Sequence, residues 1–192
     1  MPLITLGEIM DLIIMTFFVG YVFSGIIPIR RENYDPLVQY KKRFEGLKFA
    51  IMATAPAIIL HELAHKFAAL GFGLNAVFYA FYRDTFTLML GILTIISKLT
   101  GFGFMFFVPG FVGISGKGTH LEFALTALVG PLVNLILWLA ARFMLKRKGY
   151  NKKYHLLLVL TSRINMFLFI FNILPIPGFD GYKIFINLIK AF

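Results

Sequence analysis

Residues 47–73, LKFAIMATAPAIILHELAHKFAALGFG, form a long apolar run that carries the sequence HELAH in its second half. A helix needs about 20 apolar residues to cross the roughly 30 Å hydrocarbon core of a bilayer, so the run is long enough to span. Ionisable side chains at membrane depth are costly and usually mark a functional site. This stretch therefore predicts a membrane helix with a functional site on it.

The composition of the whole chain agrees with a membrane location. Of its 192 residues, 59% are hydrophobic and 23 are Phe, and the mean hydropathy is +0.81, well above the usual range for a soluble domain. The net charge of +10 comes mainly from residues 30–48 and 142–153, as expected for loops beside anionic lipid head groups. Nucleic-acid binding is not expected, because such binding needs a basic polar surface. We expect a multi-pass protein of the cell membrane with the lipid bilayer as a partner.

The apolar runs predict four transmembrane helices in a single integral membrane domain, 1–192. The first run lacks the basic start and the small-residue cleavage site of a signal peptide, so it is expected to remain in the protein. A short amphipathic tail, 182–192, is expected at the membrane interface. The four predicted spans are 9–29, 47–73, 120–145 and 154–174.

The segment between the second and third spans, 74–116, has a different character. It is dense in glycine and proline, which break helices, and residues 104–114 are rich in the aromatic and β-branched residues typical of strands. We therefore predict a re-entrant β-like hairpin here, in an otherwise all-α membrane protein with about four transmembrane helices. The apolar stretch 88–96 is either part of this re-entrant segment or a further span.

HELAH has the spacing of a metal site. His61 and His65 are four residues apart, so a helix places both imidazoles on one face. In the HExxH arrangement two histidines bind zinc, and the glutamate, here Glu62, acts as a general base. The chain has no cysteine, so a metal ion would take only nitrogen and oxygen ligands. The alternative is that these side chains only form hydrogen bonds with neighbouring helices.

A catalytic zinc ion usually has three protein ligands and one open position. Among the remaining candidates, His120 and His155 start predicted spans and are expected at the interface. Asp180 follows the sequence NILPIPGF and precedes Gly181, so prolines and glycines release its segment from helical geometry. Its carboxylate is the candidate third ligand. The alternative, equally weighted, is that Asp180 and Gly181 form a simple turn after a span.

Three motifs together resemble the site-2 protease family of intramembrane zinc metalloproteases: HELAH at 61–65, GPLVN at 130–134 and NILPIPGFDG at 172–181. The resemblance covers residues 56–182. It implies that zinc is bound by His61, His65 and Asp180, and that Glu62 is the catalytic carboxylate. It also implies that Asn172 binds the substrate backbone or a developing oxyanion. The residues that match the family's packing motif are Gly130, Pro131 and Asn134.

The implied activity is hydrolysis of peptide bonds in or near transmembrane segments of substrate proteins. Two flanking positions depart from the family pattern, which usually has Leu at the place of Phe179 and a bulky residue or Pro at that of Gly178. These departures concern specificity more than zinc binding. The alternative function is a non-catalytic metal-binding or protease-like membrane scaffold, but the intact Glu62 favours an enzyme. The sequence leaves the oligomeric state open.

Overall fold

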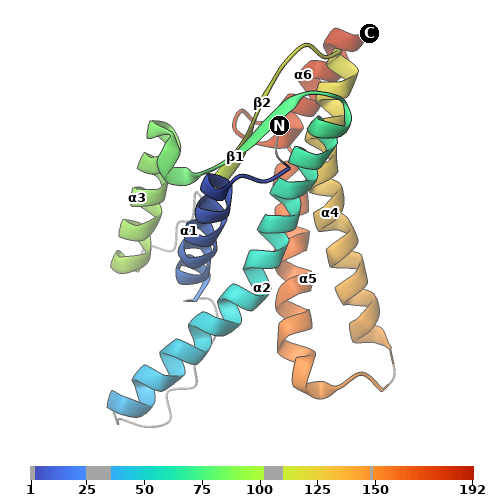
Figure 1. The fold of residues 1–192 in the computed structure, drawn as a ribbon. Helices are drawn as coiled ribbons and strands as arrows, with labels where there is room; N and C mark the ends of the chain where they lie inside the picture. Colours follow the sequence, from blue (N-terminus) through green and yellow to red (C-terminus); the bar gives the residue numbers. More distant parts are fainter. Residues whose placement is uncertain (1–2, 25–35, 102–109, 148) are drawn as a thin grey trace. The chain divides into compact units, whose positions relative to one another are not determined.

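The computed structural model describes residues 3–24, 36–101, 110–147 and 149–192, and within these residues the chain is mostly helical (Figure 1). A small two-stranded sheet accompanies the helices. Short 3₁₀ turns are formed by Phe81–Arg83 and Lys152–Tyr154. The main elements are α1 (Leu6–Phe23), α2 (Pro36–Gly71), β1 (Asn75–Ala80), α3 (Thr85–Thr100), β2 (Gly110–Ser115), α4 (His120–Lys146), α5 (His155–Asn172) and α6 (Asp180–Ala191).

Four helical segments of the described chain are long and apolar enough to cross a membrane, which confirms the predicted fold class. They correspond to the four predicted spans, with shifted ends. The first begins three residues earlier than predicted, and the predicted end of that span lies outside the described residues. The four segments are α1, the Phe44–Gly71 part of α2, α4 and α5.

Contacts within the chain divide it into two compact units. The first contains Ala57–Phe78 and Val112–Phe192, and the second contains Ile4–Pro56 and Tyr79–Phe111. The chain passes between the units within α2 and within both strands. Each unit is described by itself below. The single domain 1–192 stays a prediction.

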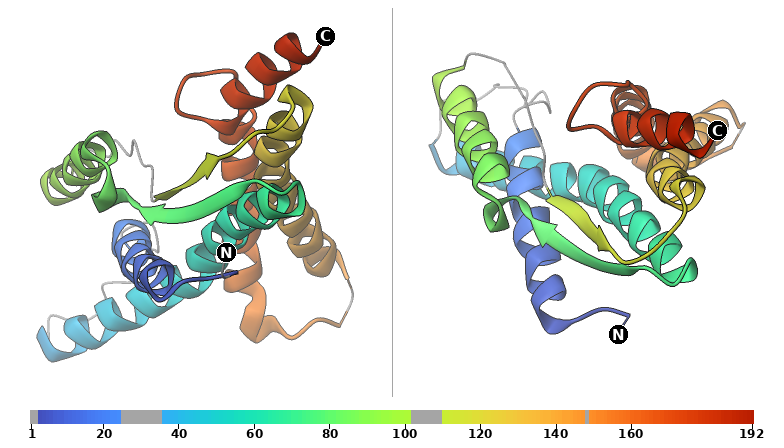
Figure 2. Two further views of the ribbon diagram at one scale, coloured as in Figure 1. Left: turned by 45° about the horizontal axis from the view of Figure 1, so that its top comes forward. Right: turned by 90° about the horizontal axis from the view of Figure 1, so that it is seen from above.

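In the first unit, α4 packs against both α5 and α6 (Figures 1 and 2). The helix begins at a capping box, in which Thr119 and Glu122 exchange side-chain and backbone hydrogen bonds and so satisfy free N–H groups of the first turn. After α5 the chain turns through a loop that contains both prolines of NILPIPGF, and Gly178 adopts the left-handed conformation there (φ +100°). Asp180, which we expected on unwound chain, is the first residue of α6.

In the second unit, α1 carries a buried carboxylate that is fully paired. Asp11 accepts hydrogen bonds from the Tyr82 hydroxyl and from Arg83 Nε, the latter at 3.2 Å. Nearby, Phe18 of α1 stacks on Phe81 with ring centroids 4.0 Å apart. A buried charge is costly unless it is paired. The hydrogen bonds from Tyr82 and Arg83 therefore lower the free-energy cost of burying Asp11 in an apolar span.

The stretch 88–96 lies within α3, a helix of 16 residues that is shorter than the four spans. Asp84 caps its N-terminus by accepting a hydrogen bond from Thr87 N. Gly101 ends it in the left-handed conformation, with φ +72°, which favours glycine because it has no Cβ.

The predicted β-like element exists as a two-stranded sheet. β2 includes residues 110–114 of the predicted strand, whereas 104–109 lie outside the described residues. Its partner is β1, a strand that the sequence analysis did not predict. The two strands are separated in the chain by α3, so the element is not a hairpin with a tight turn. The missed signal was the sequence NAVFYA, which contains β-branched and aromatic residues typical of strands.

Candidate metal centre

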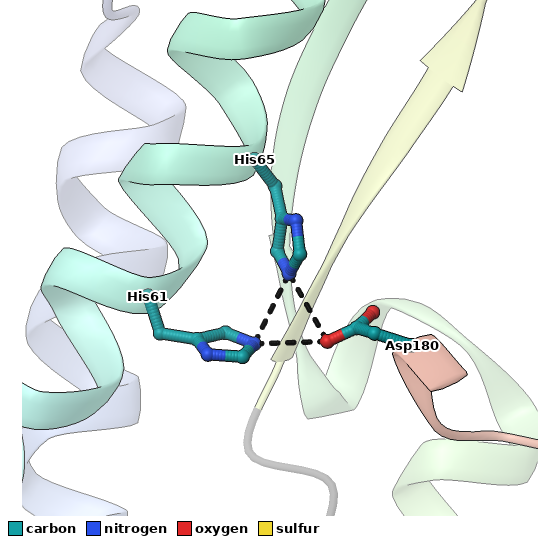
Figure 3. A group of neighbouring side chains, drawn as sticks. All are labelled: His61, His65 and Asp180. Atoms are coloured by element: carbon teal, nitrogen blue, oxygen red, sulfur yellow. Dashed lines mark hydrogen bonds and ion pairs between the residues drawn. The ribbon is translucent and has the colours of Figure 1, made fainter. Parts of the chain in front are cut away.

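Two histidines of α2 and one aspartate of α6 converge in the first unit (Figure 3). His61 Nε2 and His65 Nε2 are 3.1 Å apart, and each lies 3.1 Å from Asp180 Oδ2. The imidazoles meet because their residues are one helical turn apart. All three residues are buried, with 5–8% of their surface exposed.

The opposite ring nitrogens of the histidines face oxygen atoms of α4. His61 Nδ1 lies 2.6 Å from Asn134 Oδ1, and His65 Nδ1 lies 2.7 Å from the carbonyl oxygen of Thr126. These oxygens can only accept, so each Nδ1 carries the proton of a neutral imidazole. Both Nε2 atoms then present lone pairs to each other and to the Asp180 carboxylate.

Three acceptors can converge at these distances only around a cation, which is either a proton on one imidazole or a metal ion. A single proton joins two of the three atoms and leaves the third unpaired. A metal ion satisfies all three. The 3.1 Å sides of the triangle are close to the roughly 3.3 Å between ligands of a tetrahedral zinc site with bonds of about 2.0–2.1 Å. The donor set therefore fits zinc, which commonly takes His₂ and one carboxylate.

Asp180 uses its two oxygens differently. Oδ2 faces the histidines, whereas Oδ1 lies 3.6 Å from Lys183 Nζ, one turn further along α6. Burial alone would raise the pKa of the Asp180 carboxyl, but a proton on a facing imidazole Nε2 lowers this pKa below its ordinary range. A metal ion in place of that proton would likewise keep the carboxylate ionised, as a metal ligand must be.

Gly130 allows α4 to pass close beside the two histidines. A Cβ atom at this position would lie 2.2 Å from His65 Nε2 and 2.8 Å from His61 Cε1. Such contacts are far below van der Waals separation, so a side chain fits here only if the two imidazoles move. This close approach gives a physical reason for the glycine of the GPLVN motif.

The other predicted site residues lie as follows. Glu62 is buried on α2 directly after His61. Asn172 is the half-buried last residue of α5, and in the described part of the chain its side chain forms no hydrogen bond with the three converging residues. His120 and His155 are exposed at the starts of α4 and α5, where they contact Asn187 and Tyr150.

Sequence reasoning missed the two partners of the histidine Nδ1 atoms. Asn134 was assigned only to a packing motif, and Thr126 contributes a backbone carbonyl, which carries no sequence signal. The available signal for Asn134 was its spacing. It lies eight residues after Thr126 and four after Gly130, so all three fall on one face of α4.

The fold and the site together define a membrane protein with a buried group able to bind a metal ion. No protein-family model and no solved structure matches the chain. It is 32% identical over 178 residues to "Putative zinc metalloprotease MJ0611" of Methanocaldococcus jannaschii, covering 92% of this chain and 82% of that protein. It is 26% identical over 163 residues to "Putative zinc metalloprotease YwhC" of Bacillus subtilis, covering 74% and 70%. The chain belongs to this family of zinc metalloproteases.

Proposed function

We propose that the chain is an intramembrane zinc metalloprotease of the site-2 protease type. It would cut peptide bonds in or near transmembrane segments of other proteins of the cell membrane. The observation that carries the proposal is the buried triangle of His61, His65 and Asp180, because two of its corners lie on a helix long and apolar enough to span. The relationship to zinc metalloproteases supports the same reaction class.

In this proposal the three converging side chains hold zinc, and Glu62 supplies the acid–base chemistry. A zinc ion there would polarise the scissile carbonyl and lower the pKa of a water molecule. Glu62 takes a proton from the attacking water as the C–O bond forms. It then delivers that proton to the leaving amine as the C–N bond breaks. The products are a carboxylate and an amine.

The proposed substrate must reach the site in extended form, because a transmembrane helix hides its peptide bonds in its own hydrogen-bond ladder. Addition of a strand to a sheet edge would replace those hydrogen bonds, and β2 (Gly110–Ser115) is the candidate edge. Asn172, at the end of α5, is assigned to the substrate backbone or the oxyanion on the basis of the family resemblance. Proline substitutions along β2 should then impair cleavage of a transmembrane substrate more than cleavage of a short extended peptide.

Metal content and cleavage, measured on the same preparation, test the proposal. The purified protein should contain one zinc ion and should cleave a model transmembrane substrate, and a chelator should stop cleavage reversibly. Asp180→Ala should sharply reduce the bound zinc. If zinc binds but no substrate is cut, the non-catalytic scaffold is favoured. If Asp180→Ala keeps its zinc, the proposed ligand set is wrong.

A further inference from the structure

The Asn134 amide lies at the centre of a buried hydrogen-bond network behind the metal centre. Its Oδ1 is 2.6 Å from His61 Nδ1, and its Nδ2 is 2.9 Å from Asn165 Oδ1 and 3.2 Å from the carbonyl oxygen of Ala57. Asn134 and Asn165 are both 0% exposed. A side-chain amide has two N–H groups, so both donors of Asn134 are used.

The neighbours of Asn134 determine which way its amide points. The Ala57 carbonyl can only accept, so the nitrogen of Asn134 must face it. Asn165 Nδ2 donates to the Thr161 carbonyl at 2.8 Å, so Asn165 also presents an oxygen to Asn134. Two acceptors on one side hold the Asn134 nitrogen there and turn its oxygen towards His61.

This orientation selects the tautomer of His61. The Asn134 oxygen can only accept, so His61 carries its proton on Nδ1. The lone pair of Nε2 then points at His65 and Asp180, where a metal ion would need it. With the Asn134 amide reversed, an N–H would face Nδ1, and the proton would move to Nε2 and block the metal.

We infer that Asn134 is a positioning residue of the metal centre, and that Asn165 helps to hold it in the orientation that leaves His61 Nε2 free to bind metal. The inference rests on the proposed function, since it requires a metal ion at the triangle. It also means that the Asn134 N–H groups are not available to a substrate. Loss of a hydrogen-bond partner behind a metal-binding histidine typically weakens metal affinity about 10–100-fold.

The decisive experiment compares two substitutions of Asn134 in the purified full-length protein. Asn134→Leu removes the oxygen that His61 Nδ1 needs, whereas Asn134→Asp keeps an oxygen there and replaces the NH₂ group with a second carboxyl oxygen. Zinc affinity is measured by competition with a chromogenic chelator, and thermal unfolding of the metal-free forms is followed separately. We expect a roughly 10–100-fold loss of affinity for the Leu variant, with most of it recovered in the Asp variant. Equal losses in both variants would reduce Asn134 to a packing residue and overturn the inference.

Asn165→Leu tests the second link of the network. The Ala57 carbonyl still orients Asn134 in this variant, so the loss of zinc affinity should be smaller than for Asn134→Leu. An affinity equal to that of the parent would remove Asn165 from the proposal. The matched control is Asn187→Leu, which deletes the same hydrogen bond from His120 at the exposed end of α4 and should leave zinc affinity unchanged.

Nitrogen-15 NMR of labelled histidine in the metal-free protein reports the tautomer directly. The proton of His61 should reside on Nδ1 in the parent and should redistribute in Asn134→Leu, an effect that a loss of packing alone would not produce. An unchanged tautomer would contradict the inference. His61→Ala separates a failure of the proposed function from a failure of the positioning role of Asn134. If this variant keeps its zinc, the proposed function fails. If it loses zinc while Asn134→Leu binds as the parent does, only the positioning role fails.

Discussion

Two histidine–asparagine pairs each include one residue of α4. In both, a histidine Nδ1 faces an asparagine Oδ1, but the surroundings differ. His61 Nδ1 lies 2.6 Å from Asn134 Oδ1 in the buried site, whereas His120 Nδ1 lies 3.0 Å from Asn187 Oδ1 at the exposed start of the helix. Water can replace either partner of the exposed pair, so the His120–Asn187 hydrogen bond contributes little to stability. Asn134 in the buried pair is 0% exposed, and an unmade hydrogen bond of a buried group costs about 1–3 kcal/mol. Burial therefore turns an ordinary hydrogen bond into a constraint on a tautomer.

Removal of each imidazole gives the largest contrast between the pairs. His61→Ala deletes a proposed zinc ligand, so we expect zinc binding and cleavage to be lost. His120→Ala deletes only a surface hydrogen bond and should retain both. Zinc content by elemental analysis and cleavage of a model transmembrane substrate measure the contrast. Parallel losses in the two variants would show that the pairs are equivalent and that the site lies elsewhere.

The glutamates beside the two histidines should differ next most strongly. Glu62→Gln keeps the side-chain shape but cannot take the proton of water, so cleavage should fall by about 10²–10⁴-fold while zinc remains bound. Glu122→Gln is the matched control, because glutamine also serves in a capping box. Loss of zinc from Glu62→Gln would make this residue a ligand or a structural group. Retained activity would refute its proposed role.

Lys183 should give the smallest effect, because it only touches the rim of the buried site. Its Nζ lies 3.6 Å from Asp180 Oδ1, but 53% of its side chain is exposed. Exposed ion pairs contribute about 0–1 kcal/mol, so Lys183→Gln should weaken zinc binding no more than about fivefold. Added salt screens exposed charges, so it should reduce the difference in zinc affinity between Lys183→Gln and the parent protein. Lys190→Gln, at the far end of α6, is the control. A loss as large as that of His61→Ala would mean that Lys183 is part of the buried centre.

The sequence predicted the parts of the site that depend on local geometry. His61 and His65 could be placed on one face from their spacing alone, and the four apolar runs corresponded to four helices. The prolines and glycines before Asp180 made it a candidate ligand, with a simple turn as an equally weighted alternative, and its assignment as a ligand came from the family resemblance. What could not be seen was its place at the first residue of α6, since helix boundaries depend on the packing of the loop before them.

The features that escaped prediction depend on long-range contacts. Asn134 reaches His61 across 73 positions of sequence, and the carbonyl of Thr126 is common to every residue type. β1 was missed because its partner strand, β2, lies beyond α3, so neither a tight turn nor a neighbouring strand marked it. Non-local pairing of this kind left only a short run of strand-favouring residues in the sequence, and such a run cannot be told from part of a helix by periodicity alone.

Gly130 shows that a position without a side chain can define the space at the metal centre. The methyl group of Gly130→Ala would project to within 2.2 Å of the nitrogen that His65 directs at the metal, and would compete with an ion for the same volume. A single methyl group could thus exclude the metal ion by occupying its space. It would give a metal-free protein that keeps all three proposed ligands, and hence a reference state for separating what the metal contributes to folding from what it contributes to chemistry.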